Sequence, residues 1–371
     1  MVKEKYTIGN DHSIKNLKMF QFVKSAYSLY YKYSIKIKEL EVPEDISHRE
    51  IGYGYLKKVD SRNISFDNEK EYLKWILQNS PFHLYKSLSY MEYPEVSGGT
   101  SKKGIFKREI AFDIDVHRTN KCKHDESWIC EHCLNEGKNQ VFTLIEDYLF
   151  PDFGLSKDDI IIAFSGNRGY HIYLKPKSED IKNMIEHWDR HQRRFFISYI
   201  LGKNLNLNKV GSGWKRRLIK AFKKNRIGTT KFEKSNDWKK IIESRKNKDK
   251  IYKIIEDTKN RLELDEKVME DDIRLLRVIG SLHGYTGFIV KRLKYSSLEV
   301  FNPLYHSVFS KFDKIILNVN IKSTVDDLEI RNNIYNHKSK EVPLSYILFL
   351  YGHGIDFEIL DNISNINLSH K

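Results

Sequence analysis

Two aspartates one residue apart, Asp113 and Asp115, stand in the apolar segment IAFDIDV at positions 110–116. In an extended strand, alternate side chains share a face, so both carboxylates lie on one side and the apolar side chains on the other. Two carboxylates this close favour a divalent cation, and Mg²⁺ or Mn²⁺ bound in this way suits phosphoryl and nucleotidyl transfer. Because an isolated D-x-D pattern is weak, a polar strand end paired with Lys or Arg is the alternative.

The chain's three cysteines lie within one short segment that also contains histidine. They form a C-x-H-x5-C-x2-C pattern: Cys122, His124, Cys130 and Cys133. Thiolates and imidazole in a short loop suit tetrahedral Zn²⁺, and four protein ligands leave no open position, which predicts a structural zinc. His132 or the more distant His117 could replace His124, and unligated buried cysteines are the alternative to a metal site.

The segment FSGNRGYHIYL contains a third group of reactive side chains. Gly166 and Gly169 permit a tight turn between two strands, which directs Ser165, Arg168 and His171 to one region. Arginine matches phosphate oxygens in a bidentate manner, so this turn is suited to binding a triphosphate. A hairpin with a surface arginine fits the same pattern equally well.

Positive charge is concentrated in one part of the chain. The 371 residues include 64 Lys and Arg against 50 Asp and Glu, and residues 178–260 carry +13 of the net +14. No acidic residue occurs between Arg190 and Phe232, where there are 13 basic ones. This favours contact with a nucleic-acid backbone, although a solvated helical face or an acidic protein partner would also fit. The residues expected to form the strip are Lys215, Arg216, Arg217, Lys223 and Lys224.

The elements that position these residues alternate between helical and strand patterns. We expect a helix over 16–34, strands over 49–56, 109–116, 160–164 and 170–174, and an amphipathic helix that ends near Pro151. Residues 178–260 are mostly helical in pattern, with interruptions at 211–214 and 228–230. The sequence therefore predicts an α/β (α+β) fold with a catalytic domain of residues 1–177 plus 261–371, and a basic helical insertion over 178–260.

Location can also be predicted from composition. No apolar stretch approaches the roughly 20 residues that span a bilayer, and the first residues lack the apolar region of a signal peptide. Three cysteines do not make a secreted disulfide framework. We expect a cytoplasmic protein with no membrane partner.

Taken in order, these motifs resemble the small catalytic subunit of archaeal and eukaryotic-type DNA primases. The resemblance rests on the D-x-D strand, the cysteine–histidine knuckle at 117–133, the S-G-x-R-G-x-H turn and R-L-L-R-x-x-G-S-L-H-G at 274–284. It extends to REIGYG (49–54) and SYMEYPEV (89–96), and the C-x-H form of the knuckle is typical of archaeal members. It implies the α/β catalytic core of that family with an added zinc knuckle.

The resemblance also implies roles for single residues. The family's third catalytic carboxylate falls on Asp265, with Asp271 and Asp272 as chemical rivals. The residues implied to bind nucleotide phosphates are Ser165, Arg168, His171, Arg277 and His283. Two positions depart from the family pattern. Asn167 is an extra residue in the turn, and Tyr285 replaces a lysine found in many relatives, so that contact could come from Lys291 or another base.

The implied activity is template-directed synthesis of short RNA primers on single-stranded DNA, and in archaeal members also of DNA, from NTPs or dNTPs. Mg²⁺ or Mn²⁺ held by the three aspartates would catalyse nucleotidyl transfer. The implied partner is a large subunit that carries an Fe–S cluster, in a nucleoid-associated heterodimer. A repair or gap-filling polymerase of the same superfamily, a two-metal nuclease and a non-catalytic zinc-containing nucleic-acid binder are the alternatives.

Overall fold

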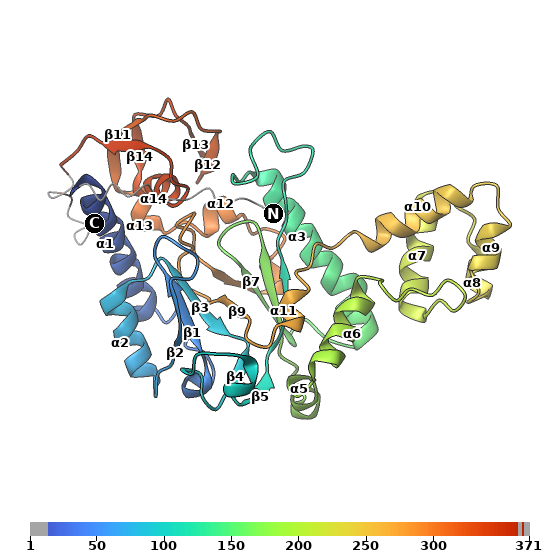
Figure 1. The fold of residues 1–371 in the computed structure, drawn as a ribbon. Coiled ribbons are helices and arrows are strands. Elements are labelled where there is room, and N and C mark those ends of the chain that lie inside the picture. Colours follow the sequence, from blue (N-terminus) through green and yellow to red (C-terminus); the bar gives the residue numbers. More distant parts are fainter. Residues whose placement is uncertain (1–13, 363–365, 367–371) are drawn as a thin grey trace.

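Two antiparallel four-stranded sheets form the centre of the fold in the computed structural model, which describes residues 14–362 and 366 (Figure 1). The first sheet has the order β2 (Ser61–Ile64), β1 (Ile51–Gly54), β3 (His83–Ser87), β9 (Leu275–Arg277). The second has the order β10 (Lys291–Leu293), β7 (Ile160–Phe164), β8 (Tyr170–Leu174), β6 (Ile110–Ile114). The predicted α/β fold is confirmed.

Helix α1 (Ile14–Lys36) supports the first sheet together with α2 (Glu69–Asn79). The helix packs through apolar residues at helical spacing. Four of them are buried, Phe22, Val23, Ala26 and Tyr30, and Phe20 is partly buried. The Tyr30 hydroxyl donates to the carbonyl oxygen of Gly280 at 2.8 Å. The tyrosine thus connects this helix to the segment that follows β9.

Helix α3 (Glu131–Leu144) lies against β6 and β8 of the second sheet. It continues through a π-helical turn, η3 (Ile145–Leu149), into α4 (Phe150–Phe153). The helical path therefore extends slightly past Pro151, which occupies the first turn of α4 where no backbone donor is needed. Gly154, with φ of 66°, then ends it.

The basic segment 178–260 is mostly helical and divides into two parts. The predicted interruption at 211–214 is wrong, because α7 begins at Ser212. Helices α5 (Glu179–Glu186) and α6 (Arg190–Ile200) adjoin the body, where Phe196 of α6 packs on Phe112 of β6 with ring centroids 5.6 Å apart. The remaining helices form a projecting lobe: α7 (Ser212–Lys224), α8 (Thr230–Lys234), α9 (Lys239–Glu243) and α10 (Lys248–Lys259) (Figure 1).

The two ends of this lobe meet at its base. A Cβ on Gly202, just before the lobe, would lie 3.0 Å from Cγ of Lys259 at its end. Buried aromatic side chains from α7, α8 and the segment before α9 form the lobe's core: Phe222, Phe232 and Trp238. The lobe thus has an apolar centre of its own and leaves the body through adjacent chain segments.

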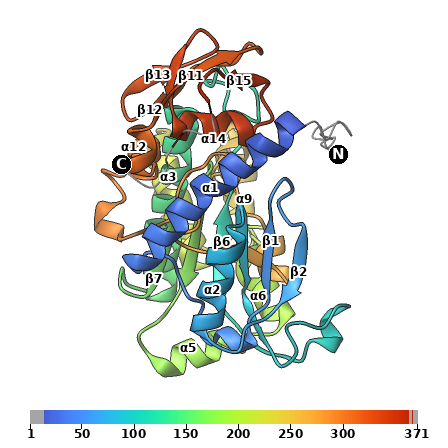
Figure 2. The same ribbon diagram turned by 90° about the vertical axis from the view of Figure 1, so that its left-hand side faces the viewer.

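The C-terminal part forms a small mixed unit at one end of the molecule, beside α1 (Figure 2). Its sheet has the order β14 (Glu341–Pro343), β11 (Ile316–Ile321), β15 (Phe357–Ile359), and β12 (Leu328–Ile330) pairs with β13 (Asn333–Tyr335). Short helices complete it: α12 (Pro303–His306), α13 (Ser310–Asp313) and α14 (Leu344–Gly352). In the described part of the chain, no helix is long and apolar enough to cross a membrane.

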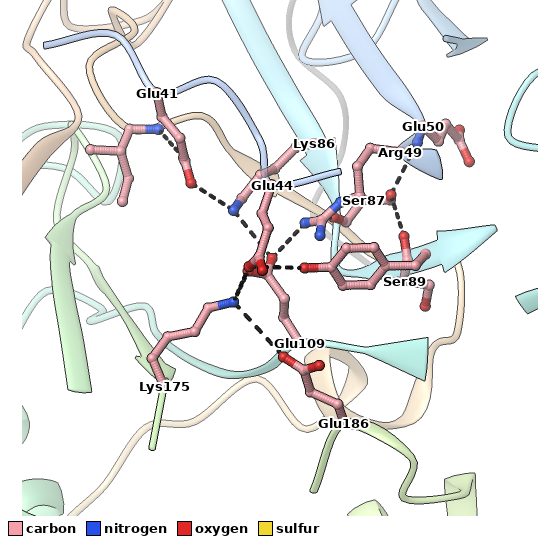
Figure 3. Close-up of polar contacts among 12 residues, drawn as sticks. Glu41, Glu44, Arg49, Glu50, Lys86, Ser87, Ser89, Glu109, Lys175 and Glu186 are labelled. Atoms are coloured by element: carbon pink, nitrogen blue, oxygen red, sulfur yellow. Dashed lines mark hydrogen bonds and ion pairs between the residues drawn. The ribbon is translucent and has the colours of Figure 1, made fainter. Parts of the chain in front are cut away.

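A buried ionic network connects the two central sheets (Figure 3). Glu109 lies between β5 (Ile105–Arg108), which pairs with β4 (Ser89–Met91), and β6. Its carboxylate pairs with Arg49 at 2.5 Å, Lys86 of β3 at 3.1 Å and Lys175 beyond β8 at 2.7 Å. Burial alone would raise the pKa of Glu109, but these three cations hold it well below its usual value. The network fixes the sheets that carry the two sides of the cavity described next.

Candidate active site

A polar cavity of about 730 Å³ is lined by residues of both central sheets. The acidic residues that line it are Asp113, Asp115, Glu263, Asp265 and Asp271. The basic residues that line it are Lys58, Arg62, Arg274 and Arg277. Opposite charges thus meet in one cavity, an arrangement suited to a metal-bound, phosphate-bearing substrate.

The three predicted catalytic carboxylates come together in this cavity. Asp113 is in β6 and Asp115 follows that strand. Residues 264 and 265 run antiparallel beside the strand end: Leu264 forms a bridge with Ile114, and the amide of Asp265 donates to the carbonyl oxygen of Asp113 at 3.0 Å. Backbone pairing therefore places the third carboxylate, that of Asp265, beside the strand that holds Asp113.

The two chemical rivals of Asp265 are placed differently. Asp272 is not among the cavity-lining residues and pairs with Arg193 of α6. Asp271 lines the cavity as Asp265 does, and each carboxylate accepts the main-chain amide two residues on: Asp271 from Ile273 at 3.1 Å and Asp265 from Lys267 at 3.0 Å. The position paired with the D-x-D strand is that of Asp265.

The pKa of Asp113 is strongly raised by its surroundings in the cluster. Burial, and then the neighbouring carboxylates of Asp115 and Asp265, raise its pKa to about 7 against the opposing effect of Arg274. A divalent cation would remove this repulsion, so the three carboxylates fit a Mg²⁺ or Mn²⁺ site. The sequence reasoning assigned no role to Arg274, whose guanidinium pairs with the carboxylate of Asp265.

The turn after β7 contributes only some of its predicted residues to the cavity. Ser165 and His171 line it, and Nε2 of His171 lies 3.5 Å from Oδ1 of Asp113. Arg168 does not line it, because its Nη1 donates to the main-chain oxygen of Glu126 at 2.5 Å and to Oε1 at 2.9 Å. In this structure Arg168 therefore faces the cysteine–histidine loop, not the expected phosphate position.

Arg277 and His283 both line the cavity, as expected for phosphate ligands. Arg277 of β9 contacts Nδ1 of His83 at 3.1 Å and lies 4.8 Å from the centre of the Tyr85 ring. These two β3 residues were missed by sequence reasoning, because no local pattern distinguishes them and only the pairing of β3 with β9 brings them beside Arg277.

The four predicted zinc ligands form one cluster, with ligand atoms within 4.8 Å of one another: Cys122, His124, Cys130 and Cys133. Nδ1 of His124 lies 2.8 Å from the carbonyl oxygen of Asp125, which leaves Nε2 free for a metal. His117 instead pairs with Glu126 at 3.0 Å. The donor set and its geometry fit a closed, structural Zn²⁺ site.

The basic strip requires one correction. Arg217 is buried, paired with Asp152 at 2.5 Å and packed 3.9 Å from the centre of the Tyr148 ring. It therefore anchors α7 to the body and cannot contact nucleic acid from this position. The other strip residues remain at least partly exposed: Lys215, Arg216, Lys223 and Lys224.

Comparison with known proteins identifies the family. Over 349 residues the chain is 63% identical to the DNA primase small subunit PriS of Methanococcus maripaludis strain C5, covering 93% of this chain and 98% of the relative. The chain belongs to the DNA primase small subunit (PriS) family. The PriS of Methanocaldococcus jannaschii is 59% identical over 345 residues, covering 92% and 99% of the two chains. That of Picrophilus torridus is 30% identical, covering 88% and 95%. No family model matches the chain.

Membership of the PriS family confirms the predicted resemblance. It also confirms the predicted class of enzyme, an archaeal DNA primase and thus a nucleotidyltransferase of DNA replication.

Proposed function

We propose that this PriS chain synthesises short RNA primers, and also DNA primers, on a single-stranded DNA template by metal-assisted nucleotidyl transfer. The observation that carries the proposal is the meeting of Asp113, Asp115 and Asp265 in one cavity with Arg277 and its neighbouring histidines. Mg²⁺ or Mn²⁺ held by the three aspartates would stabilise the charge that develops on the transferred phosphate and activate the attacking hydroxyl.

The remaining residues of the cavity bind and orient the nucleotide. Ser165, His171, Arg277 and His283 contact the phosphates of an incoming NTP or dNTP. The 3′-hydroxyl of the primer, or of the first nucleotide, attacks the α-phosphorus. A new phosphodiester bond forms, the bond to the bridging oxygen breaks, and pyrophosphate leaves. Arg168 joins these ligands only after its guanidinium leaves Glu126.

The template lies along the projecting lobe. Lys215, Arg216, Lys223 and Lys224 contact its phosphates, which sets affinity without reading sequence. Because α5 and α6 pack on the body, the DNA-binding part of the 178–260 insertion is the lobe α7–α10, and 1–177 with 261–371 forms the catalytic domain.

The partner is the large primase subunit, in a heterodimer, since the relatives are named small subunits. That subunit holds the Fe–S cluster, because all three cysteines of this chain belong to the zinc cluster. The zinc is structural and stabilises the loop beside Arg168. A cytoplasmic, nucleoid-associated location follows from the DNA template.

One experiment tests this function. The purified chain, with and without the large subunit, is incubated with single-stranded template and labelled nucleotides but no primer. We expect new oligonucleotides that depend on the template and are absent with Asp113→Asn. Synthesis only when a primer is added would favour a gap-filling polymerase, and no synthesis in either form would contradict the proposal.

A further inference from the structure

The four basic side chains that line the cavity differ in how they are neutralised. Arg62 pairs with Glu50 at 2.5 Å, and Arg274 pairs with Asp265. Each of these arginines therefore has a carboxylate partner and contributes little net charge to the cavity.

The other two cations, Arg277 and Lys58, have no carboxylate partner among residues 14–362. Arg277 is only 7% exposed and contacts the imidazole of His83, not an acid. Burial first, and then the charges of Arg277 and Lys58, hold the pKa of His83 well below its usual value. Both cations therefore act on the same imidazole, and neither of them forms an ion pair with a carboxylate among residues 14–362.

The backbone holds Lys58 in position on a closed turn between β1 and β2. The amide of Tyr55 donates to Oδ2 of Asp60 at 2.7 Å, and the amide of Asp60 donates to the oxygen of Tyr53 at 2.9 Å. A Cβ on Gly54 would lie 2.1 Å from the carbonyl oxygen of Lys57, so only glycine allows the turn to fold back this closely.

Lys58 lines the cavity, whereas its neighbour Lys57 does not, although both are exposed. We propose that Lys58 completes a phosphate subsite with Arg277, which binds the outer phosphates of the incoming nucleotide and then the departing pyrophosphate. An arginine and a lysine that line one cavity without a carboxylate ion pair are suited to a group with several negative oxygens. This inference rests on the proposed nucleotide-binding function of the same cavity.

The test compares Lys58→Gln with the matched control Lys57→Gln in the full-length chain. Calorimetric titration measures the affinity for ATP and for AMP, and fluorescence anisotropy measures the affinity for a single-stranded oligonucleotide. We expect Lys58→Gln to weaken ATP binding about 5- to 10-fold, with AMP binding unchanged. Lys57→Gln should change neither affinity, and oligonucleotide binding should be the same in both variants.

The outcomes distinguish whether Lys58 contacts the phosphates of a nucleotide or those of a nucleic-acid backbone. Loss of oligonucleotide affinity without loss of ATP affinity would show that Lys58 contacts a nucleic-acid backbone, and would overturn the proposal. Unchanged ATP affinity, or an equal loss in the two variants, would also overturn it. If the unsubstituted chain binds no ATP, the nucleotide site itself fails, which is a distinguishable result.

Discussion

The main-chain amide of Asp265 donates a hydrogen bond to the carbonyl oxygen of Asp113, with 3.0 Å between nitrogen and oxygen. This bond and the bridge between Ile114 and Leu264 extend the β6 edge of the second sheet by a segment that comes after all the helices of residues 178–260. The carboxylates are thus brought together by backbone pairing, and a metal would compete with Arg274 for the carboxylate of Asp265.

Asp265→Asn should reduce primer synthesis by at least about 100-fold, because an amide supplies oxygen but no charge to the metal. Asp271→Asn is the control, since Asp271 lines the same cavity but the backbone bond to Asp113 is made by Asp265. Synthesis is measured with labelled nucleotides, and thermal unfolding checks the fold. If Asp271→Asn loses activity and Asp265→Asn does not, the third carboxylate is Asp271.

The zinc cluster should hold about one Zn²⁺ per chain, measured by elemental analysis of protein purified without chelator. His124→Ala should lose the metal and unfold at a lower temperature. His132 lies outside the cluster, so His132→Ala should keep the bound zinc and the unfolding temperature of the unsubstituted chain. A chain with no bound zinc, or loss with His132→Ala alone, would contradict this ligand set.

Two basic residues of α7 should behave in opposite ways. Arg217→Gln removes the buried partner of Asp152, which keeps the partly exposed Arg216 at 2.6 Å, and should destabilise the fold by about 1–3 kcal/mol, measured by urea unfolding. Lys224→Gln should leave stability unchanged and reduce the slope of log affinity for single-stranded DNA against log salt by about 0.7. Equal stability of the two variants would show that the Arg217 contact is dispensable.

We expect Arg193 of α6 to position Asp265 indirectly, by holding α11 (Lys267–Glu270), the helix that follows Asp265. Its Nε donates to the oxygen of Met269 at 2.8 Å, and the guanidinium also pairs with Asp272. Arg193→Lys should raise the Mg²⁺ concentration for half-maximal synthesis about 10-fold. Arg194→Lys, which alters only an exposed pair with Glu270, should not; identical metal titrations would refute the role.

Stability should depend on pH through Glu109. Its folded pKa lies well below the unfolded value because Arg49, Lys86 and Lys175 surround it. The resulting stability is present above the unfolded pKa, about 4.3, and is lost as the pH falls toward the folded pKa. Urea unfolding should therefore show a large deficit for Glu109→Gln at pH 7 that shrinks below pH 4. A deficit independent of pH would point to packing alone.

Sequence patterns were sufficient where the chemistry is local. The zinc ligands lie within twelve residues, and strand alternation alone places Asp113 beside Asp115. The position of Asp265 required the family resemblance, because its pairing with β6 spans the insertion. The contacts of Arg168 and Arg217 in this structure could not be predicted, since their partners, Glu126 and Asp152, come from other elements. Charge patterning identifies a basic segment but not which of its side chains are buried.

The contact between Gly202 and Lys259 at the base of the lobe has a consequence for protein engineering and for evolution. Because the chain enters and leaves the lobe at adjacent points, the helices between them can be shortened, exchanged or replaced by a brief linker without cutting either central sheet. Such a graft would also need a new partner for Asp152, which the lobe's Arg217 now supplies. The fold thus offers a modular attachment point at which the lobe can change independently of the cavity that holds Asp113, Asp115 and Asp265.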